Sequence, residues 1–283
     1  MDGSVYTTAV GGDRDVLGSL RPGMHGRVHS AFRSVINVAT EHPELFSLTA
    51  ASVARAPRAI QVCLDRMDHH GIAVGDHVSS DGHTLRIGES FVVVVSATPV
   101  WEECVSDGVP IAGRVDVLAA LLNAPVPMRS PSAFELAVVE RVKSGVETLE
   151  SAVLADDAEG AQRGVASLVG LGLGLTPTGD DVLTGAAFVA SRLGGPLELV
   201  HRAVSGVVES GATNDISLTA MRCALRGRAV QPIEDVYSWL CGATTHNPHR
   251  LVADVLAIGH TSGADLALGL LTAVRLHQES QER

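Results

Sequence analysis

Apolar residues recur with two different periods along the 283-residue chain. Between residues 46 and 100 they alternate with polar neighbours, as at Phe46, Leu48 and Ala50, which is typical of half-buried strands. From about residue 132 onward they recur every three or four positions, which is typical of helices with one buried face. The change of period predicts an α+β fold, with a small, mostly antiparallel β domain followed by a mainly α-helical domain.

Turn signals and an apolar run support the predicted sheet. Val74–Val78 and Thr84–Ile87 flank Asp81 and Gly82, a pair that suits the positive φ angles of a tight hairpin turn. Phe91–Val95 is an unbroken apolar run, which favours a central strand covered on both faces. We therefore expect a small antiparallel sheet or partial barrel in this region.

The pattern ahead of the sheet is weaker. Apolar residues in Arg27–Ala39 fall at a helical spacing, and Pro43 follows as a stop signal, so one helix is predicted there. We assign residues 1–110 to a β-rich N-terminal domain and residues 111–283 to a helical domain.

Helix start and stop signals recur in the second half. Ser132 and Glu135 have the spacing of a capping box, and Pro232 and Pro248 open later helices that end at glycines. These signals predict that residues 132–277 contain helices and turns without strands.

The most unusual stretch of the helical half is Gly170–Gly185, which reads Gly-Leu-Gly-Leu-Gly-Leu-Thr-Pro-Thr-Gly-Asp-Asp-Val-Leu-Thr-Gly. Glycine at every second position of its first part lets another group approach the backbone closely. Thr178 suits a helix N-cap, and Asp180 and Asp181 would then lie in the first turn. A bare loop leading into a helix N-terminus suits an anion, but two carboxylates would repel a naked phosphate. The stretch therefore indicates a bound cation or an amide donor on the ligand.

A second stretch repeats part of the first. Thr178-Gly179-x-Asp181-x-x-x-Gly185 and Ser262-Gly263-x-Asp265-x-x-x-Gly269 share one spacing, at an offset of 84 residues. One interpretation is two separate capped helices, whose acids simply favour the helix dipole. The other is a shared site, in which the two helices converge and their aspartates face each other across one small ligand. Gly172–Gly174 would then line the same cavity.

A third polar helix start lies at Thr213–Ser217. It is either an ordinary N-cap made by Thr213 or Asp215, or a further source of hydroxyl donors for the same pocket.

Charge and composition exclude several classes of protein. The formal charge of −11 and the scattered basic residues argue against binding to nucleic acid or to an anionic membrane. Aromatic residues make up only 3% of the chain, which disfavours base stacking. No apolar leader opens the chain, and Cys63, Cys104, Cys223 and Cys241 form no CxxC pair, so we expect a reduced, cytoplasmic protein.

Three motifs, in this order, resemble the bacterial family named for the AllH subunit of oxamate carbamoyltransferase: Gly170–Asp181, Thr213–Ser217 and Gly259–Asp265. The resemblance is strong over residues 165–283. It is fainter over residues 25–105, where His29–Phe32 and the strand pattern are compatible with it. The family's usual glycine-proline-glycine loop is replaced by Gly172-Leu173-Gly174, and Asn214 stands where threonine is common.

The resemblance implies a subunit of a multi-protein enzyme that interconverts oxalurate plus phosphate with oxamate plus carbamoyl phosphate, in allantoin-type nitrogen catabolism. Its partners would be these small anionic substrates and other subunits of the complex. Asp181 or Asp265 would accept the –NH2 group of oxamate or carbamoyl phosphate, and His260 would assist proton transfer. The alternatives are a non-catalytic assembly subunit and a stand-alone enzyme acting on another small amide or carbamate.

The candidate site residues fall into two groups. The candidate catalytic residues are Asp180, Asp181, Asp265 and His260. The candidate ligand-binding residues are Gly172, Gly174, Thr176, Thr178, Gly179, Thr213, Asn214, Ser217, Thr261, Ser262 and Gly263. Asp180 and Asp181 are also candidate ligands of a metal ion such as Mg²⁺, and the sequence indicates no other cofactor.

Overall fold

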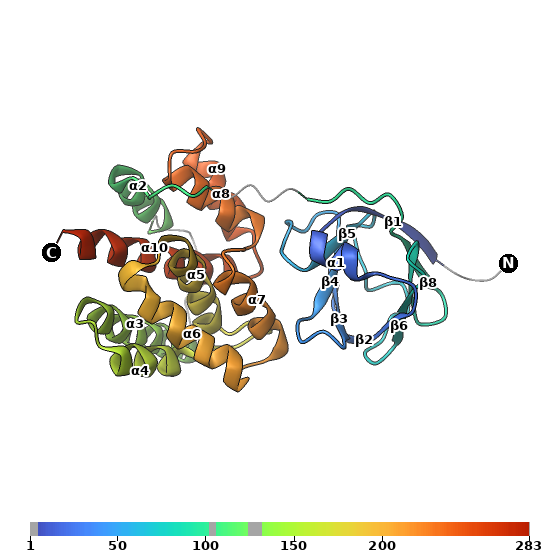
Figure 1. Cartoon of the computed structure of the whole chain (residues 1–283), viewed down its shortest axis with the longest axis horizontal. Coiled ribbons are helices and arrows are strands. Elements are labelled where there is room, and N and C mark those ends of the chain that lie inside the picture. Colours follow the sequence, from blue (N-terminus) through green and yellow to red (C-terminus); the bar gives the residue numbers. More distant parts are fainter. Residues whose placement is uncertain (1–4, 102–105, 124–131, 283) are drawn as a thin grey trace. The chain divides into compact units, whose positions relative to one another are not determined.

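The computed structural model describes residues 5–101, 106–123 and 132–282, which fall into two compact units, Met1–Glu103 and Cys104–Arg283 (Figure 1). Each unit has its own apolar core. None of the described helices has the length and apolar character needed to cross a membrane.

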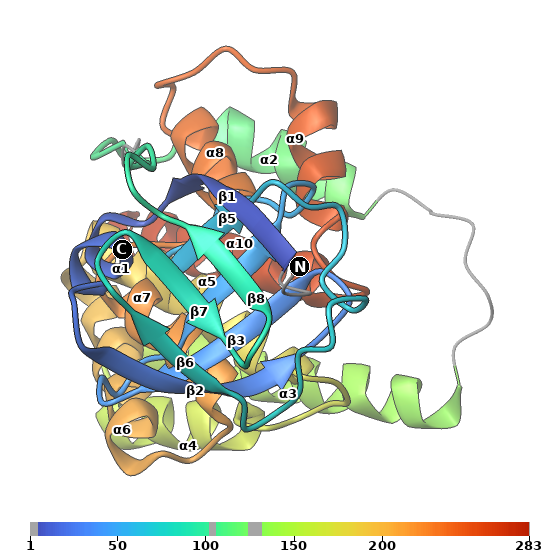
Figure 2. The same cartoon turned by 90° about the vertical axis from the view of Figure 1, so that its right-hand side faces the viewer.

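Eight strands of the first unit form a closed barrel (Figure 2). They are β1 (Val5–Gly12), β2 (Met24–Ala31), β3 (Val35–Thr40), β4 (Phe46–Ala50), β5 (Ala59–Val62), β6 (His77–Ser80), β7 (Thr84–Ile87) and β8 (Phe91–Val94), and one short helix, α1 (Arg14–Ser19), follows β1. Their order around the barrel is β1-β5-β4-β3-β2-β6-β7-β8.

The expected mostly antiparallel sheet is wrong, because the barrel is closed and mixed. β1 runs parallel to β8, and β4 runs parallel to β5, while the other neighbouring pairs are antiparallel. The parallel contact of β1 and β8 pairs Val5 with Phe91. β1 and β8 lie at opposite ends of the barrel's sequence and share no tight turn, so short-range patterns do not reveal their pairing.

The helix predicted over Arg27–Ala39 is also wrong. This segment contains the end of β2 and nearly all of β3, which pair antiparallel around a tight turn closed by a bond from the Phe32 N–H to the Val35 carbonyl, 2.8 Å. Ile36 and Val38 are fully buried, two positions apart, as a strand requires. The turn interrupts the alternation of apolar residues. Taken together, the apolar residues of the two strands then fall at a spacing that resembles that of a helix.

The hairpin predicted around Asp81 and Gly82 is confirmed. It joins β6 to β7 with Ser80 opposite Leu85. The Asp81 carboxylate accepts the N–H groups of His83 and Thr84, and Gly82 has a φ of 87°. The turn thus combines an aspartate that bonds its own backbone with a glycine in the left-handed region.

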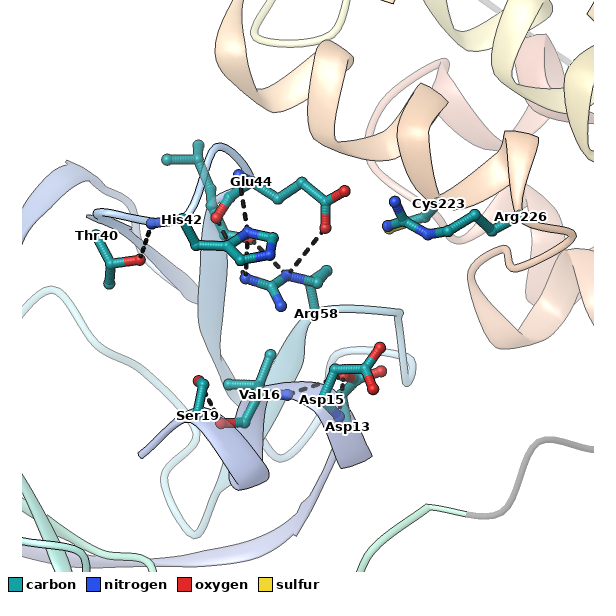
Figure 3. A network of polar contacts seen from close by, with 11 residues as sticks. Asp13, Asp15, Val16, Ser19, Thr40, His42, Glu44, Arg58, Cys223 and Arg226 are labelled. Carbon is teal, nitrogen blue, oxygen red and sulfur yellow. Dashed lines mark hydrogen bonds and ion pairs between the residues drawn. The ribbon is translucent and has the colours of Figure 1, made fainter. Parts of the chain in front are cut away.

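A second polar network fixes the connection between β3 and β4 (Figure 3). The Arg58 guanidinium donates to the carbonyl oxygens of Glu44 and Leu45 and lies 3.5 Å from the Glu44 carboxylate. His42 accepts the Glu44 N–H through Nδ1, 3.2 Å. Arg58 directly precedes β5, so these contacts hold the β3–β4 connection against the beginning of that strand.

Helices form the whole secondary structure of the second unit as far as it is described, which confirms the all-helical prediction for residues 132–277. They are α2 (Ala112–Leu122), α3 (Ala133–Leu154), α4 (Ala158–Leu168), α5 (Thr178–Leu193), the 3-10 helix η1 (Gly195–Leu197), α6 (Glu198–Ser210), α7 (Asp215–Leu225), α8 (Gln231–Leu240), α9 (Pro248–Leu256) and α10 (Ser262–Gln281). The capping box of Ser132 and Glu135 at the start of α3 is present. α5 is buried at every position from Gly179 to Ala190 and packs most extensively against α10, so these two helices form the centre of the unit.

Candidate functional site

Two glycines bring α5 and α10 into close contact. A Cβ atom added to Gly185 would overlap the carbonyl oxygen of Leu266, and one added to Gly269 would overlap the carbonyl oxygen of Val182. At the 84-residue offset, Gly185 corresponds to Gly269 and Val182 corresponds to Leu266. The contact is therefore reciprocal, and the two copies of the motif are related by a local pseudo-twofold axis. Val182 and Leu266 occupy the unspecified position directly after the aspartate of each motif, so the 84-residue offset would have identified them from the sequence.

The hydroxyl groups that open the two motifs cross to the opposite helix. The predicted caps at Thr178 and Ser262 are wrong, because the N-cap positions are Pro177 and Thr261 and neither makes a side-chain cap. Instead, the Ser262 hydroxyl hydrogen-bonds to Asp181 on α5, and the Thr178 hydroxyl hydrogen-bonds to Asp265 on α10. Leaving a carboxylate without donors at a close helix–helix contact costs more free energy than leaving the first-turn amides without a side-chain acceptor.

Each carboxylate also has a hydroxyl partner from its own side of the contact. Thr176 hydrogen-bonds to Asp181, and Thr261 hydrogen-bonds to Asp265. The Thr176 and Ser262 hydroxyl oxygens are 3.0 Å apart. The structure therefore brings the starts of both helices together in one polar cluster, the paired-aspartate site, defined by Asp181, Asp265 and these hydroxyl groups.

Burial disfavours the ionised form of both carboxyl groups in the paired-aspartate site. Asp181 is 5% exposed, and burial raises its pKa to about 7, with smaller contributions in the same direction from the charges of Asp265 and Asp180. Burial raises the pKa of Asp265 to about 6. The hydroxyl groups of Thr176, Thr178, Thr261 and Ser262 oppose these shifts without cancelling them.

One oxygen atom of each aspartate has no donor. Oδ2 of Asp181 and Oδ2 of Asp265 are buried and have no hydrogen-bond partner among the described residues. A buried acceptor without a donor costs about 1–3 kcal/mol, and more if it is charged. Both oxygens are therefore acceptors that a proton, an N–H group of a ligand or a cation would satisfy.

Asp180 has a different role from its neighbour. Its Oδ1 accepts the Gly170 N–H at 2.7 Å, and its Oδ2 accepts the Thr213 hydroxyl at 2.5 Å. The residue is 1% exposed. Because both oxygens have donors, Asp180 ties the glycine loop and the start of α7 to the start of α5.

The candidate glycines support the backbone of the site. Gly172 and Gly174 have φ angles of 117° and 113°, and a Cβ atom on Gly172 would lie 2.8 Å from the Thr178 amide nitrogen. Gly179 and Gly263 lie directly against carbonyl oxygens of preceding segments, and their N–H groups donate to Leu171 and Ile258 at 2.8 and 3.1 Å. These two amides are therefore not available to an anion.

The remaining candidates divide between the site and its surroundings. The cap of α7 is Asn214, rather than the predicted Thr213 or Asp215, and it accepts the N–H groups of Ile216 and Ser217 at 3.0 Å. Its amide donates to the buried Ser217 hydroxyl at 3.2 Å. His260 is exposed in the turn before α10. The described residues contain no group of three or more His, Cys, Asp or Glu side chains arranged to hold a metal ion.

Two family models match the chain. One is described as oxamate carbamoyltransferase subunit AllH and matches residues 168–274, which include the paired-aspartate site. The other is described as the AllH family N-terminal domain and matches residues 8–100, which include all of the barrel except the first residues of β1. No solved structure matches the chain significantly.

Proposed function

Because this chain belongs to the AllH family of oxamate carbamoyltransferase subunits, we propose that its paired-aspartate site binds the –NH2 end of a small anionic carbamoyl substrate, such as oxamate or carbamoyl phosphate. The observation that carries the proposal is the pair of buried acceptor oxygens without donors on Asp181 and Asp265.

The symmetry of the site supports an –NH2 group as the missing donor. A carbamoyl nitrogen has two N–H groups related by the local twofold axis of the C–N bond. The orphaned oxygens of Asp181 and Asp265 belong to equivalent positions of the repeated motif, on two helices whose contact is reciprocal. One N–H can therefore donate to each carboxylate, and both acceptors are satisfied by a single group.

Charge supports the same orientation of the substrate. The two carboxylates repel the carboxylate of oxamate and the phosphate of carbamoyl phosphate, so the –NH2 end enters between them. Held there, the carbamoyl carbon is fixed in position for transfer between phosphate and the oxamate nitrogen, and such positioning contributes substantially to catalysis. Groups that bind the anionic end come from elsewhere in the enzyme.

A specific observation also favours a second function, that of a non-catalytic assembly subunit. Gly179, Gly185, Gly263 and Gly269 are all explained by close packing against carbonyl oxygens. Packing does not require carboxylates at Asp181 and Asp265, however, and it leaves their orphaned oxygens unexplained.

Calorimetric titration of the chain with oxamate and with oxalate tests the proposal. Oxalate replaces the –NH2 group by a charged oxygen, so we expect it to bind at least about tenfold more weakly than oxamate. Asp181→Asn and Asp265→Asn should weaken oxamate binding and lower turnover of the reconstituted carbamoyltransferase at least about a hundredfold. Glu198→Gln, which removes an acid from the first turn of α6, is the matched control and should change neither.

Two experimental results would change the proposed function or the proposed ligand. If both asparagine variants melt normally and keep full activity, the chain is an assembly subunit. If oxamate binding requires Mg²⁺ and is abolished by EDTA, a cation rather than an –NH2 group satisfies the two carboxylates.

A further inference from the structure

The glycine loop before α5, residues Gly170–Thr176, exposes two large apolar side chains. Leu173 is 74% exposed and Leu175 is 52% exposed. The chain contains no charged residue from Val169 to Gly179. The loop is thus an uncharged segment with two exposed leucines, which we call the leucine loop.

Hydrogen bonds hold the leucine loop at both ends. At its beginning, the Gly170 N–H donates to Asp180 at 2.7 Å, and the Leu171 carbonyl accepts the Gly179 N–H at 2.8 Å. At its end, the Thr176 hydroxyl lies 3.0 Å from that of Ser262. The leucines are therefore exposed on a fixed backbone, and a contact there orders few additional groups.

We propose that the leucine loop inserts into an apolar recess of another subunit of the same carbamoyltransferase. The description of the matching family is that of an enzyme subunit, so we take the binding partner to be another chain of the same enzyme. An uncharged segment with exposed leucines fits an apolar recess, and burial of exposed leucines is the main free energy that such a contact gains.

The loop also places that partner beside the paired-aspartate site. Thr176 directly follows Leu175 and hydrogen-bonds to Asp181. A subunit that covers Leu175 therefore lies next to the carboxylates and can supply the groups that bind the anionic end of the substrate. The inference that the partner supplies substrate-binding groups rests on the proposed function. The proposal that the partner binds the leucine loop does not.

The test combines assembly with ligand binding. The wild-type chain, Leu173→Asp, Leu175→Asp and the double variant are mixed with the other purified subunits of the enzyme, and association is measured by sedimentation and by titration. Each substitution should weaken association about tenfold to a hundredfold, and the double variant should not assemble. Leu136→Asp on α3 is the matched control, because Leu136 is also 52% exposed, and it should assemble normally.

Oxamate titration of the isolated variants separates the two proposals. Lost assembly of the variants with unchanged oxamate binding supports the docking proposal. Lost assembly of the variants, together with no oxamate binding by the assembled wild-type enzyme, supports docking while overturning the proposed function. The docking proposal is overturned if the double variant assembles with wild-type affinity or if Leu136→Asp is equally impaired. It is also overturned if the variants abolish only self-association of this chain.

Discussion

The starts of α5 and α10 are built on one pattern but are connected differently to the rest of the helical unit. Both present a hydroxyl, a close-packed glycine, an aspartate and a second close-packed glycine at the same spacing. They differ at the position before the aspartate, where α5 has the buried Asp180 and α10 has the exposed Ala264. They also differ two residues before the hydroxyl, where Thr176 precedes α5 and the exposed His260 precedes α10.

The difference separates two tasks. The shared positions make the reciprocal contact and carry the crossed hydroxyl groups, so both copies are needed for the pair of carboxylates. The positions found only in α5 attach that pair to the leucine loop and, through Thr213, to α7. The two helix starts are therefore symmetric in their mutual contact but asymmetric in their surroundings, because only the start of α5 is bonded to the leucine loop and to α7.

The largest effect is expected from pH and Asp181. Because the pKa of Asp181 is about 7 in the folded protein and 3.8 ordinarily, the folded state binds a proton more tightly than the unfolded state. The stabilising contribution is complete below about pH 4 and is lost as pH rises through about 7, an effect on the order of 4 kcal/mol. Asp265 acts in the same direction.

Denaturant unfolding of the unliganded chain at pH 5 and pH 8 measures about 3 kcal/mol of this contribution, because pH 5 already lies above the ordinary pKa of an aspartate. Asp181→Asn should remove most of the difference between the two pH values, so the variant is more stable than the wild type at pH 8. Glu198→Gln should leave the wild-type difference intact. A wild-type chain that shows the same pH dependence as Asp181→Asn would contradict the shift.

The next largest effect is expected from the packing glycines. Gly185→Ala and Gly269→Ala each place a methyl group on a backbone carbonyl that cannot move aside easily, which should cost about 2–3 kcal/mol of stability. Because the contact is reciprocal, the two losses should be similar. Gly206→Ala in α6 meets no atom within 4 Å and should stabilise the protein by about 0.5–1 kcal/mol. Clearly unequal losses at Gly185 and Gly269, measured by thermal unfolding, would break the symmetry.

The smallest effect is expected from the crossed hydroxyl groups. Thr178→Val and Ser262→Ala each remove one donor from the carboxylate of the opposite helix, which should cost about 1 kcal/mol at pH 8. The cost should shrink at pH 5, where the carboxylates are protonated. Thr148→Val, on the surface of α3, should show neither the loss nor the pH dependence. A Thr178 effect that persists at pH 5 would assign that hydroxyl a purely structural role.

The fold was predictable where the signals are local. Pro248, Gly242 and the Ser132 box mark helix ends through backbone chemistry that acts within four residues, and the Asp81–Gly82 hairpin is equally local. The closed barrel depends on the parallel pairing of Val5 with Phe91, which no short window contains. Distance along the chain hid the closure of the barrel, whereas the helix expected over Arg27–Ala39 was wrong for a local reason, because a tight turn interrupts the alternation of apolar residues.

In the site, the repeated spacing indicated which residues meet but not how they bond. Thr178 and Ser262 resemble N-caps in sequence, because a cap and a crossed donor use the same residue type at the same position. Whether the hydroxyl caps its own helix or bonds to the aspartate of the opposite helix depends on the approach of that second helix. The role of Asp180 was hidden for the same reason, since its partners Gly170 and Thr213 lie 10 and 33 residues away.

The reciprocal contact of α5 and α10 has a consequence for the order in which the protein is made. The ribosome completes α5 and then synthesises most of another 84 residues before α10 can reach it. During that interval the bare surface around Gly185 and the carboxylate of Asp181 have no partner from the second motif. The nascent helical unit therefore exposes surface that molecular chaperones can bind, and Gly269 and Asp265 supply the missing partners only once α10 has been made.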